Sequence, residues 1–275
     1  MCRLFGMLSV RPKNARKYLI EDPCSLLVQS KVDPKRLQKD GWGIGYYKNG
    51  HAILIKSEKP IFEESEHFSS IVDQAISTVI IAHIRQASNP RGLPREKIIS
   101  KVSSQPFMYK NFIFAHNGVI RIPDEVANVL GKWKSMIKGF NDSETYFWYI
   151  IKEIEEGLSF QEALKRFQET LINLWNKHHV KYPQLKGPYE GLNVVFSDGD
   201  KIYAYAKYTK NAELSKSICY KEQPSLQLSY IHTDEQLIIS SEKTNQSQDW
   251  KPLNNGNLLT GWVSKGKIEI KIQKI

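Results

Sequence analysis

Two helical patterns in the middle of the chain separate two long stretches that are patterned as strands. Residues 141–157 and 159–179 each begin with polar residues suited to capping and continue with apolar residues about 3.6 positions apart. Gly157 ends the first pattern, and the second opens with Ser159 and has Glu162 three positions later, which is a capping box. A fold for this chain therefore has to bury one face of each of two adjacent helices.

The flanking stretches indicate short strands joined by tight turns. Asn-Gly at 49–50 and Asp-Gly at 198–199 are typical of hairpins, and each lies between two apolar segments. Strands before and after a helical pair predict an α+β protein with layered antiparallel sheets, and not a doubly wound parallel fold. No repeat, low-complexity tract or linker divides the chain, so we expect residues 2–275 to form a single domain. The predicted strands cover residues 2–10, 41–47, 51–57, 77–85, 106–120, 191–208, 226–233, 236–243, 257–262 and 266–274.

Composition limits the location and the partners. No apolar run approaches the roughly 20 residues that cross a bilayer, so we expect no membrane span. The chain opens without a secretory signal and carries three cysteines, Cys2, Cys24 and Cys219; this odd number favours a reducing compartment, the cytoplasm. The formal net charge of +10 raises nucleic acid as a partner. However, the lysines are dispersed, which favours a solvated surface.

The motifs indicate neither a metal nor a cofactor. His83, His116 and the pair His178-His179 lack the spacing of zinc ligands, and the cysteines are too far apart for a CxxC site. The GWGIG segment has no third glycine at the right offset and no helix after it, so it does not fit a dinucleotide-binding loop. Its glycines indicate either a close approach of another backbone or a segment that passes beside a buried active centre.

Cys2 directly follows the initiator methionine. Removal of Met1 would give Cys2 both a thiol and a free α-amine. An ordinary thiol has a pKa of about 8.5 and an α-amine one of about 7.7–8.0, so the neutral amine can take the proton of the thiol near neutral pH. The two groups are thus a candidate nucleophile and a candidate base.

Three further motifs each allow a structural and a catalytic interpretation. Arg85 and Ser88 follow a buried strand, where the guanidinium either pairs with a local carboxylate or grips a substrate carboxylate. Within residues 106–120 we expect two strands around Lys110-Asn111, the second ending at His116-Asn117-Gly118. Asn117 and Gly118 at that strand end form either a simple turn or two donors for an oxyanion. Asp142 is either part of a helix cap or a partner for a substrate ammonium. Each motif alone favours the structural interpretation. Together with the N-terminal thiol, they supply an oxyanion hole and clamps for both charges of an amino acid.

With this set of motifs the chain resembles the class II glutamine amidotransferases, which are N-terminal nucleophile (Ntn) hydrolases. The motifs MCRLFG, DGWGIGYY, AHIRQAS, AHNGVI, NDSE and, more weakly, IISSEK follow one another in the family's order over residues 2–242. The resemblance implies a four-layer αββα sandwich. Arg3 and Gln86 stand where synthetase-linked members have glycine and tryptophan, and this departure is similar to the stand-alone subgroup.

The resemblance also implies an activity without a cofactor. The Cys2 thiol would attack the γ-amide of glutamine or a γ-glutamyl compound, form a γ-glutamyl thioester, and release ammonia or an amine. A separate synthetase or peptidase chain is one expected partner, and a glutathione-type γ-glutamyl peptide is an alternative substrate. A non-catalytic γ-glutamyl-binding module is the alternative from another class. The resemblance assigns Cys2, Asn117 and Gly118 to catalysis and Arg85, Ser88 and Asp142 to substrate binding.

Overall fold

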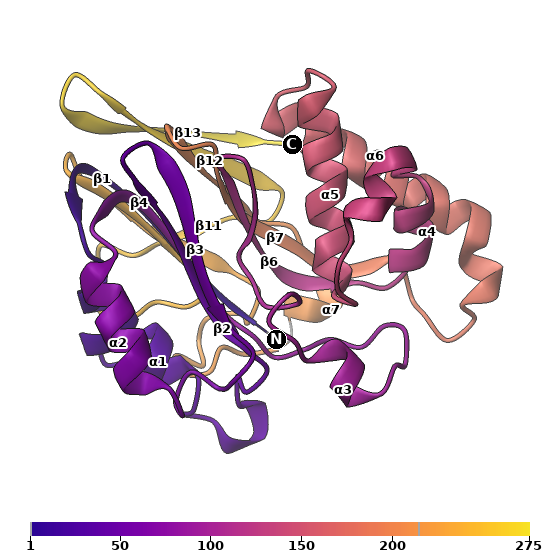
Figure 1. Cartoon of the computed structure of the whole chain (residues 1–275), viewed down its shortest axis with the longest axis horizontal. Coiled ribbons are helices and arrows are strands. Elements are labelled where there is room, and N and C mark those ends of the chain that lie inside the picture. The colour runs from indigo at the N-terminus through magenta and orange to yellow at the C-terminus, as the bar shows by residue number, and fades with distance from the viewer. Residues whose placement is uncertain (1, 214) are drawn as a thin grey trace.

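The computed structural model describes residues 2–213 and 215–275, which form two stacked antiparallel sheets with helices on both outer faces (Figure 1). The first sheet has the strand order β11 (Lys251–Leu253), β9 (Leu228–His232), β10 (Gln236–Ser240), β1 (Arg3–Lys13), β4 (Ser77–Ile84), β2 (Trp42–Lys48) and β3 (His51–Ser57). The second has the order β13 (Lys267–Lys274), β12 (Asn257–Ser264), β8 (Lys201–Tyr205), β7 (Tyr189–Ser197), β6 (Phe112–Ile120) and β5 (Phe107–Tyr109).

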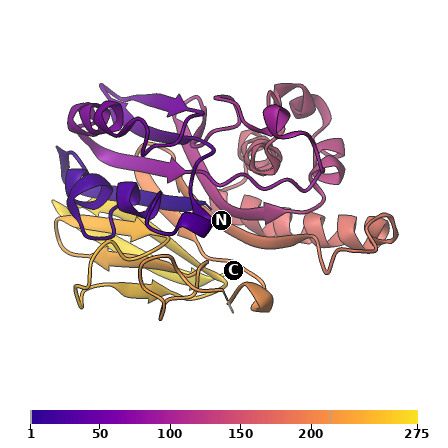
Figure 2. The same ribbon diagram turned by 90° about the horizontal axis from the view of Figure 1, so that it is seen from below.

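Each sheet has its own layer of helices, as the two views in Figures 1 and 2 show. The second sheet is covered by α4 (Pro123–Asn128), α5 (Asp142–Glu155) and α6 (Phe160–His178). The first sheet is covered by the π-helix η1 (Lys17–Glu21), α1 (Leu26–Gln29) and α2 (Ser65–Gln74). The remaining short helices are η2 (Pro34–Arg36), α3 (Arg95–Ile98), η3 (Gly131–Met136), η4 (His179–Lys181) and α7 (Lys210–Glu213).

The core lies in three apolar layers, one between the sheets and one under each set of helices. Because successive strand residues point to opposite faces, one strand contributes to two layers. In β6, Ile113 and Ala115 pack between the sheets, whereas Phe114 and Ile120 pack under the helices. The predicted αββα sandwich with antiparallel sheets is confirmed.

The two predicted long helices are confirmed with their caps. Asn141 caps α5 by accepting a hydrogen bond from Ser143 N, and Ser159 and Glu162 form the predicted capping box of α6. Helix α2 was not predicted. It buries Phe68, Ile71 and Val72 but has no side-chain cap, so the local sequence carries no clear start signal.

The GWGIG segment is a place of close backbone approach. Gly41 has a φ of +118°, and a Cβ atom there would lie 2.2 Å from Ser104 Oγ. A Cβ atom at Gly43 would lie 2.5 Å from the carbonyl oxygen of Gln105. Both distances are far below contact, so these positions exclude side chains and let β2 pass against residues 104–105.

Cys24 and Cys219 form a disulfide across 195 residues of sequence, and Cys2 is a free thiol. The odd number of cysteines therefore no longer supports a reducing compartment, because disulfides persist in oxidising surroundings and are rare in reducing ones. The cysteine argument for the cytoplasm no longer holds. Among the described residues, no helix combines the length and the apolar character that a bilayer span requires.

Candidate active site

Cys2 lies directly before β1, at one end of the space between the sheets. The register of β1 and β4 sets Arg3 opposite Ile84, so one position further out Cys2 and Arg85 face each other. Leu4 packs between the sheets, and Cys2 shares its face because it lies two residues away. Its side chain is only 9% exposed. The nucleophile candidate thus lies in a buried position.

The surroundings of the Cys2 thiol favour its protonated form. The Sγ atom donates a hydrogen bond to the carbonyl oxygen of Gln86 at 3.4 Å. Burial raises the pKa of the Cys2 thiol; the positive charge of Arg85 acts to lower this pKa, and the negative charge of Asp142 acts to raise it. A base is therefore needed to generate the thiolate.

The guanidinium of Arg85 binds backbone carbonyls. Its Nη1 atom donates to Ile98 O at 2.8 Å and to Asp40 O at 3.3 Å, and we find no paired carboxylate among the described residues. The predicted alternative of a local carboxylate partner is therefore wrong. The Asp40 carboxylate accepts from Ala87 N at 2.7 Å and pairs with Arg95. Three of the five N–H groups of Arg85, those on Nε and Nη2, have no acceptor in the described chain.

Asp142 is the first residue of α5, but it is not the cap. Its Oδ1 accepts from the Ser88 hydroxyl and its Oδ2 from Ile120 N, both at 2.7 Å. Ser88 was predicted to act beside Arg85, whereas its hydroxyl lies on Asp142. Each carboxylate oxygen can accept more than one hydrogen bond, so the buried carboxylate keeps capacity for a ligand.

Asn117 lies inside β6, so the prediction that β6 ends there in a turn is wrong. Its Nδ2 donates to the Ser241 hydroxyl at 3.4 Å, and its buried Oδ1 has no donor among the described residues. The Ser241 hydroxyl also accepts from Leu4 N at 2.8 Å. Ser241 thereby connects Asn117 to the strand that carries Cys2.

Gly118 is required by close packing of two strands. A Cβ atom at this position would lie 1.9 Å from the carbonyl oxygen of Gly191 in β7. Leu192 lies directly opposite Gly118, and its N–H donates to Lys207 O on the other side. Facing residues of an antiparallel pair point their N–H groups either at each other or apart, so the Gly118 N–H points away from β7.

This N–H lies along an open edge of β6, because β5 pairs with β6 only up to Phe114. Two side chains bind neighbouring N–H groups on the edge. His116 N donates to Gln105 Oε1 at 2.7 Å, and Ile120 N donates to Asp142. Gly118 lies between His116 and Ile120, and its N–H points out from the same edge of β6.

The ring of the buried His116 is held by hydrogen bonds at both nitrogens. His116 Nε2 lies 3.0 Å from Gly191 O, which can only accept, so Nε2 carries the proton and Nδ1 accepts from the Ser143 hydroxyl at 2.8 Å. Burial lowers the pKa of His116, and it lowers that of His83 well below the ordinary value. His116 is therefore poorly suited to serve as an alternative base.

Sequence reasoning gave no role to Ser241 or Glu242. Both belong to the weak motif IISSEK and directly follow β10. The signal available in the sequence was the pair of polar residues after a buried strand. The ligand atoms of Cys24, Cys219 and Glu242 lie within 4.8 Å of one another, as in a metal site. However, both sulfur atoms are in the disulfide and the carboxylate is bound by backbone N–H groups, so this group is not suited to a metal.

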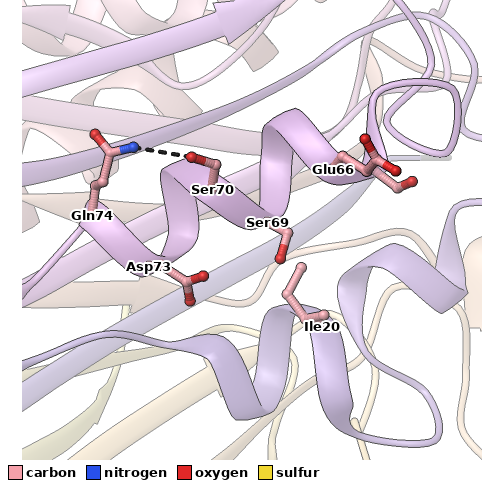
Figure 3. Close-up of a pocket in the computed structure, with 7 residues that line it drawn as sticks. Ile20, Glu66, Ser69, Ser70, Asp73 and Gln74 are labelled. Carbon is pink, nitrogen blue, oxygen red and sulfur yellow. Dashed lines mark hydrogen bonds between the residues drawn. The ribbon is translucent and has the colours of Figure 1, made fainter.

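The predicted site residues do not line the cavity of about 580 Å³ between α2 and η1. Figure 3 shows Ser69 on α2 turned toward Ile20, with Gln74 bonded to Ser70. The residues that line this cavity include no cysteine and no histidine. The cavity offers no counterpart to the groups around Cys2.

Comparison with known families gives one match over almost the whole chain. The family model described as glutamine amidotransferases class-II matches residues 1–274. An uncharacterized protein of Methanocaldococcus jannaschii is 27% identical over 241 residues, which is 80% of this chain and 60% of that protein. The chain thus spans less than two thirds of the length of that relative.

Two solved structures share the fold. A glutamine aminotransferase class-II domain protein from Silicibacter pomeroyi has a TM-score of 0.61 at 17% identity, with 98% of each chain covered. The glutamine phosphoribosylpyrophosphate amidotransferase of B. subtilis has a TM-score of 0.58 at 14% identity; the match covers 98% of this chain and 49% of that one.

Proposed function

The chain belongs to the class II glutamine amidotransferases, and on that premise we propose that it hydrolyses the γ-amide of glutamine or of a γ-glutamyl compound through Cys2. The observation that most supports this proposal is the unused hydrogen-bonding capacity of Arg85 and Asp142, two opposite charges that both act electrostatically on the Cys2 thiol. A ligand with an α-carboxylate and an α-ammonium would satisfy both.

In the proposed reaction, the Cys2 sulfur attacks the γ-carbonyl carbon. The α-amine of Cys2, exposed by removal of Met1, accepts the thiol proton and passes it to the leaving nitrogen. Ammonia or an amine leaves, and water then hydrolyses the γ-glutamyl thioester to glutamate. Met1 itself lies outside the described residues.

Asn117 and Gly118 are the proposed oxyanion hole. In the structure the Asn117 Nδ2 donates to Ser241, and the Oδ1 has no partner in the described chain. A 180° turn of the amide would let the Ser241 hydroxyl donate to Oδ1 and would leave Nδ2 as a donor for a ligand. Loss of one such donor typically costs about 3–4 kcal/mol in the transition state.

Arg85 and Asp142 are the proposed clamps. The free N–H groups of Arg85 suit a substrate carboxylate, because a guanidinium binds both of its oxygens in a planar fork. Asp142 would bind the α-ammonium. Ser88 donates to Asp142, so we assign it to the ammonium side of the site and not to the carboxylate side.

A substrate panel on the protein with Met1 removed tests this proposal. The substrates are glutamine, a γ-glutamyl anilide, glutathione, and glutamine analogues that lack the α-amine or the α-carboxylate. Ammonia, glutamate and released amine are measured separately, with Cys2→Ser as the blank. We expect cleavage of compounds that keep both charges and little cleavage of the truncated analogues. If no γ-glutamyl compound is cleaved by the processed protein, hydrolysis is refuted, and equilibrium binding of glutamine then tests the binding-module alternative.

A further inference from the structure

Arg3 lies directly behind the proposed nucleophile. Its Nη1 atom donates to the carbonyl oxygen of Cys2 at 3.0 Å. Its Nε atom lies 3.5 Å from Glu242 Oε2, and the two side chains are 1% and 0% exposed. Since neighbouring residues of a strand point to opposite faces, Arg3 holds Cys2 from the face opposite to the thiol.

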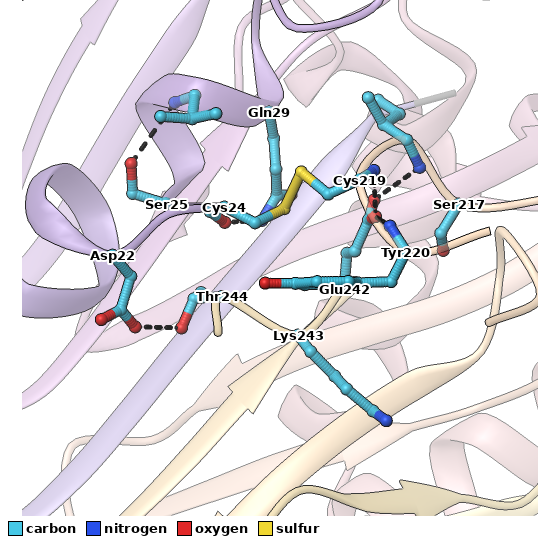
Figure 4. Close-up of a disulfide and its surroundings, with 12 residues drawn as sticks. Asp22, Cys24, Ser25, Gln29, Ser217, Cys219, Tyr220, Glu242, Lys243 and Thr244 are labelled. Carbon is cyan, nitrogen blue, oxygen red and sulfur yellow. Dashed lines mark hydrogen bonds between the residues drawn. A yellow bond between two sulfur atoms is a disulfide. The ribbon is translucent and has the colours of Figure 1, made fainter. Parts of the chain in front are cut away.

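Glu242 is itself fixed by the backbone of a loop. Its carboxylate accepts from Ile218 N and Tyr220 N, each at 2.8 Å, and from Cys219 N between them. Figure 4 shows the carboxylate against Cys219 and Tyr220, beside the disulfide. Three successive N–H groups form a concave anion site, which holds the carboxylate in one orientation.

The loop that binds Glu242 is tied to distant parts of the chain. The disulfide joins Cys219 to Cys24. On the other side, Arg36 donates from Nη1 to Lys216 O at 2.6 Å and from Nη2 to Ser217 O at 3.1 Å. Glu242, and through it the Arg3 guanidinium, therefore has little freedom to move.

The charge of Arg3 affects both reactive groups of Cys2. A nearby cation favours a thiolate over a thiol and a neutral amine over an ammonium, and these are the forms that the reaction needs. Arg3 and the Cys2 thiol interact electrostatically. Arg85 from the end of β4 acts in the same sense. Asp142 from α5 opposes it, and so does the Glu242 carboxylate that pairs with Arg3.

We propose that Arg3, held in place by Glu242, is a positioning residue for the Cys2 nucleophile. The guanidinium fixes the Cys2 carbonyl, and with it the directions of the thiol and the α-amine, and it supplies positive charge from behind. This inference deepens the proposed function, because positioning has a consequence for turnover only if Cys2 is the nucleophile.

The closing experiment measures the rate of Cys2 alkylation by iodoacetamide as a function of pH, by intact mass and peptide mapping on the full processed chain. The rate reports the thiolate fraction of Cys2 without requiring turnover. It is compared in wild type, Arg3→Lys, Arg3→Met, the double variant Arg3→Met/Glu242→Gln, and Arg16→Met. Arg16 pairs at the surface with Asp73 and Glu21, so it is a matched control for loss of an arginine.

We expect Arg3→Met alone to alkylate with a midpoint shifted up by about one pH unit, because it removes the positive charge behind Cys2 and leaves the Glu242 carboxylate. The double variant removes both buried charges together, so neither is left unpaired and its midpoint should stay near that of wild type. Arg3→Lys keeps the charge and should keep the midpoint, but kcat should fall by about 10- to 100-fold with little change in KM, because the planar fork is lost. Arg16→Met should match wild type in both measurements.

A folded Arg3→Met variant with the wild-type midpoint and wild-type kcat overturns the proposal. If Arg3→Met does not fold, Arg3→Lys decides, and a kcat at the wild-type level overturns the positioning role. If wild type cleaves no γ-glutamyl compound, the proposed hydrolysis is refuted. The alkylation midpoint still tests Arg3 in that case, so the two failures are distinguishable.

Discussion

Cys2 and Arg3 point to opposite faces of the first sheet, and the polar groups around these two residues differ in how many hydrogen bonds they form. On the side of the thiol, Arg85 keeps unpaired N–H groups and Asn117 has a buried amide oxygen without a partner in the described chain. On the opposite side, the Glu242 carboxylate accepts from three backbone N–H groups and pairs with Arg3. Both sides are buried and both carry charges.

This difference distinguishes the residues that can bind a ligand from the residues that hold Cys2 in place. Buried polar groups normally find partners, so open hydrogen-bonding capacity beside a thiol favours a ligand at that place. A carboxylate that accepts from three backbone N–H groups and pairs with an arginine instead has a fixed geometry. We accordingly expect mutations on the thiol side to lower turnover. Mutations on the opposite side should lower stability or change the position of Cys2.

Replacement of Cys2 should have the largest effect. We expect Cys2→Ser to lower turnover by roughly 10⁴-fold or more, because loss of a nucleophile removes the covalent route. The matched variant Cys24→Ser should keep turnover below its melting temperature. Steady-state release of ammonia from glutamine measures both. Equal activity of Cys2→Ser and wild type would remove the thiol from the mechanism.

An uncleavable extension before Cys2 should be nearly as damaging. The extension turns the α-amine into a peptide nitrogen, which cannot accept the thiol proton, so the chain should fold normally and hydrolyse little. Intact mass should show that active preparations of the normal chain have lost one methionine. Full activity of the extended form would require another base, and the hydrogen bonds of His116 leave it poorly suited to that role.

The clamp variants should rank third. We expect Asp142→Asn and Arg85→Lys each to reduce kcat/KM for glutamine by about 2–5 kcal/mol, which is roughly 30- to 5,000-fold, since each leaves a substrate charge poorly paired. Arg16→Lys at the surface is the control. Thermal midpoints are measured alongside, because Arg85 also holds Asp40 O and Ile98 O. Cleavage of analogues without the α-amine or the α-carboxylate at the rate of glutamine would contradict the clamp roles.

The smallest effect on activity is expected from the disulfide. Cys24→Ser should lower the free energy of unfolding by about 2–4 kcal/mol, since a cross-link restricts the unfolded chain. Denaturant unfolding of wild type and variant, each with and without a reductant, measures this. If reductant destabilises the variant as much as wild type, the bond between Cys24 and Cys219 is not the source of the stability.

Local signals predicted much of the fold. The caps at Asn141 and Ser159 and the Asn-Gly hairpin at 49–50 act within a few residues, so they can be identified in the sequence. Asn117 and Gly118 were misassigned to a strand end and a turn because the cause is distant in sequence. There Gly191 of β7 lies so close that only a glycine fits at 118, and the strand continues. That residues 2–275 form one domain stays a prediction.

The candidate site was predicted as a set of residues but not as a network. Motif order identified Cys2, Arg85 and Asp142, yet the partners of such residues are far away in sequence. Asn117 and Ser241 are 124 positions apart, and the two cysteines of the disulfide 195. Pairings at such separations depend on how the sheets stack, which no local pattern specifies.

The measurement that tests the central claim most directly is adduct mapping with a diazo-ketone analogue of glutamine. The processed protein is incubated with the analogue, with and without an excess of glutamine, then digested and mapped by mass spectrometry. The account predicts one adduct, on the N-terminal peptide at Cys2, with glutamine protecting against it and Arg16→Met labelled as wild type. An adduct at any other residue, or a folded protein with a free Cys2 thiol that forms none, would contradict the account.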